Sequence, residues 1–110
     1  MSTERILSES DRRSRDFYDR RARIYDLHLR VASLLQGVWE PGERRKFVTQ
    51  LEITPGQRVL EIAVGTGSNL TLIANDVGPE GRLTGLDLSF AMLQQCKRKF
   101  QRLNQKADLI

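Results

Sequence analysis

The stretch that decides the fold of this chain reads Val59-Leu60-Glu61-Ile62-Ala63-Val64-Gly65-Thr66-Gly67-Ser68-Asn69-Leu70. A nearly unbroken apolar run containing one carboxylate stops at a Gly-Thr-Gly turn, and an amphipathic pattern begins directly after it. A short apolar run bounded by glycines is typical of a buried parallel strand. The turn after such a strand lies at the carboxyl end of the sheet, where open α/β folds bind ligands. Glycines there let backbone N–H groups approach an anionic or zwitterionic ligand beside a helix N-terminus. The stretch therefore predicts a nucleotide-type cofactor site.

Composition places the chain among small globular proteins. Its 110 residues suit one domain, and 39% hydrophobic with 29% charged residues is ordinary. The net charge is +4, but arginines and aspartates alternate in the first third, which is typical of a solvated helix face, so we predict no nucleic-acid partner. The single cysteine, Cys96, excludes an internal disulfide and a multi-thiolate metal site. With no secretory signal and no long apolar run, we expect a cytoplasmic protein without a metal.

The first part of the chain has helical periodicity. We expect one or two helices packed on the sheet domain, with an apolar stripe formed by Ile24, Leu27, Val31, Leu34, Leu35 and Val38. Pro41-Gly42 indicates a break, followed by a short helix from about Glu43 to Leu51 whose inward face is Phe47, Val48 and Leu51. Residues 1–52 are thus predicted to form a helical cap, and residues 53–110 an α/β domain.

The second part alternates between strand and helix patterns. A strand is expected from about Arg58, a helix from near Ser68, a second strand over Arg82–Leu88, a helix capped by Ser89 and a third strand over 107–110. Such alternation predicts a parallel, doubly wound sheet of the α/β class.

Three features of this domain point to an adenosine ligand. Glu61 is a carboxylate inside an apolar strand, which is costly unless it is paired or hydrogen-bonded. The Gly65-Thr66-Gly67 turn follows it, and Asp87 ends the next strand, where an acid usually accepts hydrogen bonds from ribose hydroxyls. Together they predict a ribose at Asp87 and a charged group at the turn.

A dinucleotide-binding domain for NAD(P) or FAD is the main alternative. Its fingerprint needs a third glycine or alanine, and that position is Leu70 here. A glutamate four residues before the first glycine is also foreign to the fingerprint, because a pyrophosphate needs no carboxylate beside it. Both differences count against this alternative.

The stretch from Val59 to Gly67 resembles the first motif of class I S-adenosylmethionine-dependent methyltransferases, with Ala63, Gly65 and Gly67 in its G/A-x-G-x-G pattern. The segment Leu83–Ser89 resembles the second strand of the same Rossmann-like fold. The Tyr-Asp pairs at Tyr18 and Tyr25 are similar to those of the branch that contains ubiquinone/menaquinone-biosynthesis C-methyltransferases and phospholipid N-methyltransferases.

The resemblance implies S-adenosylmethionine as cofactor and a role for each matching residue. Gly65 and Gly67 would line its methionyl part, with Ala63 and Thr66 in the same motif, and Glu61 would support its amino group or the loop. Asp87 would hold the ribose, and Leu88 and Met92 would lie near the adenine. Tyr25 would close over the site. For Tyr25 and Met92, packing in the core is an equal or better alternative. No catalytic residue can be named.

The resemblance also implies an enzyme that methylates a small-molecule, quinone or lipid acceptor. The elements present correspond to the first half of the fold, so we expect an incomplete sheet, completed by a second copy or by another chain. A non-catalytic or truncated module acting with a partner is therefore an alternative. The arginine-rich first helix allows a third hypothesis, peripheral contact with a membrane.

Overall fold

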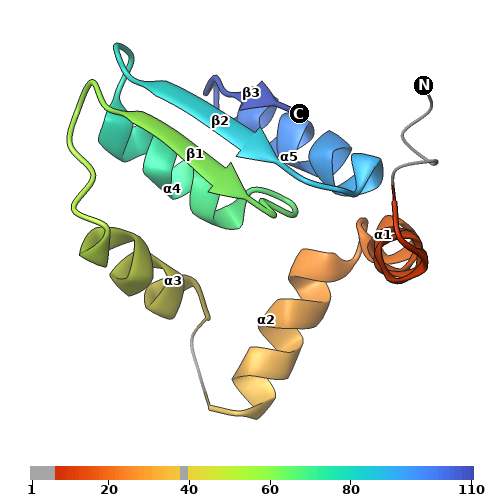
Figure 1. Ribbon diagram of the computed structural model, residues 1–110. Helices are drawn as coiled ribbons and strands as arrows, with labels where there is room; N and C mark the ends of the chain where they lie inside the picture. The colour runs from red at the N-terminus through yellow and green to blue at the C-terminus, as the bar shows by residue number, and fades with distance from the viewer. Residues whose placement is uncertain (1–6, 38–39) are drawn as a thin grey trace.

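The computed structural model describes residues 7–37 and 40–110. The elements in chain order are α1 (Glu9–Arg21), α2 (Tyr25–Leu35), α3 (Glu40–Gln50), β1 (Arg58–Ile62), α4 (Ser68–Val77), β2 (Arg82–Leu86), α5 (Phe90–Arg102) and β3 (Asp108–Leu109) (Figure 1). The expected strand–helix alternation is confirmed, and the first helical region consists of two helices that meet between residues 22 and 24.

The strands form one parallel sheet in the order β1-β2-β3. Glu61 is aligned with Gly85, and Gly85 with Leu109, so the three strands end at the same edge. Helices α4 and α5 lie on one face of this sheet (Figure 1). In the described chain the opposite face is uncovered, because Leu60 and Ile62 are 59% and 70% exposed.

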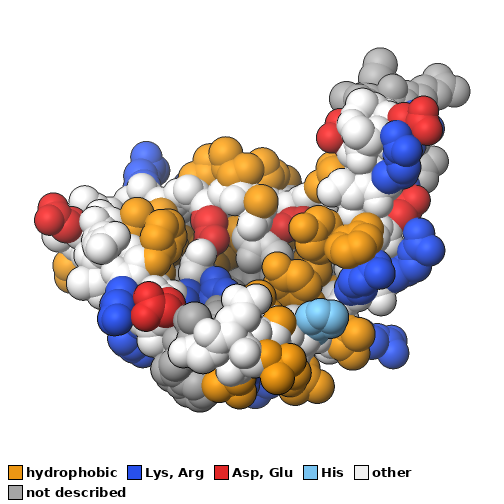
Figure 2. Space-filling view, turned by 90° about the horizontal axis from the view of Figure 1, so that it is seen from below, with side chains coloured by type: hydrophobic (Ala, Val, Ile, Leu, Met, Phe, Trp, Pro, Cys, Tyr) orange, Lys and Arg blue, Asp and Glu red, His pale blue; other side chains and the backbone are white. Residues whose placement is uncertain are grey.

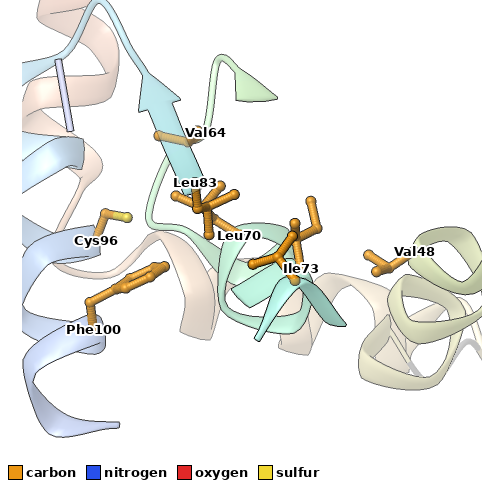
Figure 3. Packing of buried hydrophobic residues seen from close by; sticks show 8 residues of the cluster. Val48, Val64, Leu70, Ile73, Leu83, Cys96 and Phe100 are labelled. Atoms are coloured by element: carbon orange, nitrogen blue, oxygen red, sulfur yellow. The ribbon is translucent and has the colours of Figure 1, made fainter. Parts of the chain in front are cut away.

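The core lies between the sheet and helices α4 and α5. It contains Val64, Leu70, Ile73, Val77, Leu83, Cys96 and Phe100, with Val48 of α3 packed on its far side (Figure 3). Leu70 is completely buried, and a Cβ added to Gly85 would lie 2.8 Å from its Cδ2 atom. The leucine in place of a third fingerprint glycine therefore fits because the strand below it has no side chain at that point.

Local signals set the ends of the helices of this domain. The Ser89 hydroxyl accepts a hydrogen bond from the Met92 N–H at 3.2 Å, which is the predicted N-cap of α5. Gly78, with φ of 66°, ends α4. The apolar face of α5 is buried at Cys96 and Phe100, whereas Leu103 is half exposed.

Helices α1 and α2 are not packed on the sheet by an apolar face. A capping box between Ser8 and Asp11 begins α1, yet neither helix contains a buried residue over its described length. The predicted stripe is on the surface, with Leu27 67% and Leu35 84% exposed, and Val38 lies outside the described residues. Figure 2 shows hydrophobic side chains around the single histidine, His28.

The sequence-based bounds of α3 were wrong at its start. The helix begins at Glu40, so Pro41 and Gly42 lie in its first turn and do not break the chain. Proline is compatible with the first helical turn because its missing N–H has no partner there. Of the expected inward face only Val48 is buried; Phe47 and Leu51 are 53% and 46% exposed.

The turn residue Gly67 gives a test of the packing between α4 and α5. Its φ is 85°, and an added Cβ would lie 2.4 Å from Cys96 Sγ, whereas Gly65, with φ of 58°, has no atom within 4 Å of an added Cβ. Gly65→Ala should therefore cost only the left-handed strain, ~1–2 kcal/mol of unfolding free energy. Gly67→Ala should cost about 1–3 kcal/mol more.

Urea unfolding of both variants measures these losses in the free energy of unfolding. A double variant that combines Gly67→Ala with Cys96→Ala tests whether the clash with Sγ causes the larger loss. Removal of Sγ would leave the new Cβ 3.4 Å from the Cβ of residue 96, so the double variant Gly67→Ala/Cys96→Ala should recover about 1 kcal/mol relative to additivity. Strictly additive losses would contradict the clash.

Candidate functional site

A pocket of about 540 Å³ lies at the carboxyl ends of β1 and β2. Helix α1 and the start of α2 lie beyond this edge of the sheet (Figure 1). The pocket is lined by residues from both strand ends and from three helices: Ser14, Arg15, Tyr18, Tyr25, Ile62, Ala63, Gly65, Leu86, Asp87, Leu88, Ser89 and Met92. The predicted ligand-binding edge of the sheet thus coincides with a cavity.

Asp87 connects the two strand ends within this pocket. Its Oδ2 atom accepts a hydrogen bond from the Gly65 N–H at 2.7 Å, and its Oδ1 atom accepts one from the Ser89 N–H at 2.8 Å. The carboxylate therefore orders the Gly-Thr-Gly turn and the start of α5 together. A carboxylate has about four lone-pair positions, so these two bonds leave capacity for further donors.

The turn after β1 brings its backbone to the pocket without side chains in the way. Ala63 has φ of 60°, a left-handed conformation that is unfavourable for a residue with a Cβ. Gly65 lines the pocket and also has positive φ, and no atom lies within 4 Å of the position a Cβ would take. A side chain at residue 65 would project into open space beside the pocket, which glycine leaves accessible to a ligand.

Glu61 is half-buried beneath this turn. Burial raises the pKa of its carboxyl above the ordinary 4.5, although a hydrogen bond from Asn69 and the positive charge of Arg44 act in the opposite direction. Arg44 Nη1 also donates to Asn69 Oδ1 at 2.9 Å, so a small polar group joins β1, α3 and the first turn of α4. Glu61 Oε2 is buried and has no hydrogen-bond partner among the described residues.

Two tyrosines close the pocket from the side of α1 and α2. The rings of Tyr18 and Tyr25 lie edge to face, with centroids 6.1 Å apart, and both line the pocket. The sequence predicted Tyr25 as a site residue and Tyr18 only as part of a Tyr-Asp pair, and it did not point to Ser14 or Arg15. The signal was available, since Tyr18-Asp19 repeats the Tyr25-Asp26 pair seven residues earlier.

The structure brings six of the nine predicted cofactor-binding residues to the pocket wall: Ala63, Gly65, Asp87, Leu88, Met92 and Tyr25. Glu61, Thr66 and Gly67 do not line it. The Thr66 hydroxyl donates instead to Asp26 Oδ1 at 2.6 Å, and Gly67 packs against Cys96.

Residues 7–37 and 40–110 contain no group of three or more potential metal ligands, and none of their helices is long and apolar enough to cross a membrane. Cys96 is fully buried, and burial raises its thiol pKa to about 11. Both properties indicate that Cys96 is a core residue and not a nucleophile.

Comparison with known proteins identifies the family. Residues 59–110 match the family described as "Methyltransferase domain". The chain is 36% identical over 91 residues to the demethylmenaquinone methyltransferase of Symbiobacterium thermophilum. The matching region is 83% of this chain and 35% of that protein. Residues 59–110 therefore belong to a methyltransferase-domain family. It is also 40% identical over 73 residues to the ubiquinone/menaquinone biosynthesis C-methyltransferase of Xanthomonas oryzae pv. oryzae, covering 66% of this chain and 27% of the relative.

Solved structures support the Rossmann-like class I methyltransferase fold. A S-adenosylmethionine-dependent methyltransferase from Geobacter sulfurreducens, solved in complex with S-adenosyl-L-homocysteine, is 28% identical, with a TM-score of 0.53 over 62% of this chain and 28% of that one. A methyltransferase from Clostridium acetobutylicum has a TM-score of 0.57 over 78% of this chain and 35% of its own, at 21% identity, which shows the fold alone. The chain spans roughly a third of the length of the curated relatives it matches.

The pocket fits the cofactor of this family, S-adenosylmethionine, in three respects. Asp87 provides carboxylate oxygens with remaining lone pairs, suited to the vicinal hydroxyls of a ribose. Gly65 keeps the backbone accessible to a charged group. Tyr18, Tyr25 and Met92 provide apolar and aromatic surface, the usual surroundings of a planar base.

The raised pKa of Glu61 predicts a pH-dependent stability. Because the pKa of Glu61 in the folded state lies above the unfolded value of 4.5, the folded state binds the proton more tightly. The contribution of Glu61 to the free energy of unfolding is therefore complete below pH 4.5 and is lost as the pH rises through the folded pKa. Glu61→Gln removes this loss, so its gain in unfolding free energy over wild type should grow from pH 4.5 to pH 7.

Urea unfolding at several pH values in this interval measures the difference. The exposed Glu80→Gln serves as a control that should not change the pH profile. A Glu61→Gln profile parallel to that of wild type would contradict the assigned burial.

Proposed function

We propose that this chain binds S-adenosylmethionine in the pocket at the carboxyl ends of β1 and β2, as the cofactor-binding part of an enzyme that methylates a quinone-type acceptor. The observation that carries the proposal is the convergence of Gly65, Asp87 and the two tyrosines on a single pocket, although they come from separate parts of the chain. The relatives named as demethylmenaquinone and ubiquinone/menaquinone methyltransferases support the acceptor class.

The proposed roles follow from the position of each group. Asp87 would accept hydrogen bonds from the ribose hydroxyls while it continues to hold the turn through Gly65. Leu88 and Met92 would lie against the adenine, and Tyr25 with Tyr18 would cover the cofactor. These contacts would fix the cofactor in one orientation.

The motif residues outside the pocket wall would act on the turn. Glu61 would support the turn through Asn69, or would support the amino group of the methionyl part through water. Thr66 would hold the turn to α2 through Asp26, and Gly67 would allow α4 to pack closely on α5. Ala63 would shape the exit from β1 in its left-handed conformation.

The bound cofactor supplies a methyl group already activated on a sulfonium. The chain therefore needs to bind, orient and exclude water, and no proton transfer by a side chain is required of the described residues. The tyrosines and the strand ends suit this task, because they enclose the pocket with largely apolar surface.

Isothermal titration with S-adenosyl-L-homocysteine tests the cofactor proposal. Asp87→Asn keeps the size of the side chain but provides one acceptor oxygen in place of two, so affinity should fall about tenfold, and Asp87→Ala should weaken it further. Asp108→Asn is a matched control, since Asp108 pairs with Arg82 at 3.2 Å at the amino end of β2, far from the pocket edge. Unchanged affinity in Asp87→Asn, or no binding by wild type, would refute the proposal.

The acceptor class is tested separately by release of S-adenosyl-L-homocysteine from S-adenosylmethionine. We expect release with a demethylated quinol and none with a phosphatidylethanolamine vesicle. Release with the phospholipid alone would contradict the quinone assignment.

A further inference from the structure

The two Tyr-Asp pairs, Tyr18-Asp19 and Tyr25-Asp26, make the same arrangement twice. In each pair the tyrosine lines the cofactor pocket, and the aspartate that follows it binds to the sheet domain. The two tyrosines come from different helices, α1 and α2, so the repeat is not a consequence of one helix face. The function proposed above uses only the Thr66 contact of Asp26, and the other contacts of the two aspartates require an explanation.

Asp19 binds the N-terminus of α5. Its Oδ1 atom accepts hydrogen bonds from the Ser89 hydroxyl and from the Ala91 N–H, the latter at 3.3 Å. Ser89 is 1% exposed and its hydroxyl accepts from Met92 N–H at the same time, so the carboxylate extends the helix cap. A negative charge is favourable at this end of a helix. Helix α1 is thereby joined to a chain segment 70 residues away.

Asp26 belongs to a group of four polar side chains, which we call the Asp26 cluster: Asp26, Thr66, Ser68 and Lys99. Its Oδ2 atom lies 2.6 Å from Lys99 Nζ, and its Oδ1 atom accepts from the Thr66 hydroxyl at 2.6 Å. Lys99 Nζ also donates to Ser68 at 3.1 Å and to Thr66 at 3.3 Å. All three ammonium donors are therefore used, on a side chain that is 16% exposed.

These polar contacts matter because no buried apolar side chain of α1 or α2 attaches these helices to the sheet domain. Neither helix buries a residue within its described bounds, so hydrophobic burial does not fix them against the sheet. The Lys99–Asp26 pair differs from an exposed ion pair, since the side chains are 16% and 35% exposed and each carboxylate oxygen of Asp26 accepts a hydrogen bond. The position of each helix then depends on its aspartate.

We propose that Asp19 and Asp26 are positioning residues that hold Tyr18 and Tyr25 over the cofactor pocket. Asp26 acts in addition on the Gly-Thr-Gly turn, because it binds Thr66 at the centre of that turn. Closure of the helical cover and the shape of the cofactor loop are thereby coupled through the Asp26 cluster. The inference rests on the proposed function in that the ligand beneath the tyrosines is S-adenosylmethionine.

Hydrogen exchange with mass spectrometry tests the coupling without any need for activity. In Asp26→Asn, amide exchange over residues 25–35 of the ligand-free protein should rise about tenfold, while β1 and β2 keep their protection. Affinity for S-adenosyl-L-homocysteine should fall about tenfold, and Lys99→Gln should reproduce both effects. Because the two residues act as one unit, the double variant should lose no more than either single variant.

Glu43→Gln is the matched control, because Glu43 forms an exposed ion pair with Lys46 at 3.1 Å on α3. It should change neither the exchange nor the affinity. For Asp19→Asn we expect increased exchange over residues 9–21 with the same weakening of affinity. Should Asp26→Asn fail to fold, Lys99→Gln and Thr66→Val break the cluster from the other side.

The outcomes separate this inference from the proposed function. If wild type binds S-adenosyl-L-homocysteine and the Asp26 and Lys99 variants bind equally well with unchanged exchange, the positioning role is refuted and the cofactor site stands. If wild type binds no cofactor but the variants still release α2, the helix attachment stands and the cofactor proposal fails. If every cluster variant unfolds β1 and β2 as well, the aspartates have a general structural role and the inference is overturned.

Discussion

The architecture of the site depends on one carboxylate that joins two strand ends. Asp87 accepts the Gly65 N–H on one side and the Ser89 N–H on the other, and it thereby fixes the turn after β1 relative to the start of α5. Buried backbone N–H groups need partners, and a turn that leaves its amides accessible to a ligand cannot satisfy them by regular structure. A charged acceptor at the end of the neighbouring strand provides a partner and keeps the edge of the sheet open.

Two kinds of interaction divide the molecule. Apolar burial holds the sheet to α4 and α5, where Leu70 fits over Gly85 and Cys96 packs against Gly67. Polar contacts hold α1 and α2, and these contacts end on the elements that surround the pocket. Hydrogen-bonded attachments of this sort are specific in geometry but modest in net free energy, which suits helices that cover a ligand.

The exposed apolar surface forms a third feature of the chain. Among residues 7–37 and 40–110, nothing covers the sheet face that carries Leu60 and Ile62 or the apolar stripe of α2. The stripe was correctly predicted to be helical, but its expected packing on the sheet was wrong. Periodicity reports that a helix has an apolar face, and it does not report which surface, if any, covers that face.

The sequence by itself determined the α/β order, the Gly-Thr-Gly turn at a strand end and the pairing of that turn with Asp87, because these depend on local periodicity, glycine chemistry and chain order. It also contained the repeat of the Tyr-Asp pair. Only the tertiary structure decided that Thr66 binds Asp26 instead of lining the pocket, that Tyr18 joins Tyr25 there, and that Lys99 completes the cluster. The contacts between residues 26, 66 and 99 depend on how the helices pack in space. A local sequence pattern contains no information on which distant residue a side chain will contact.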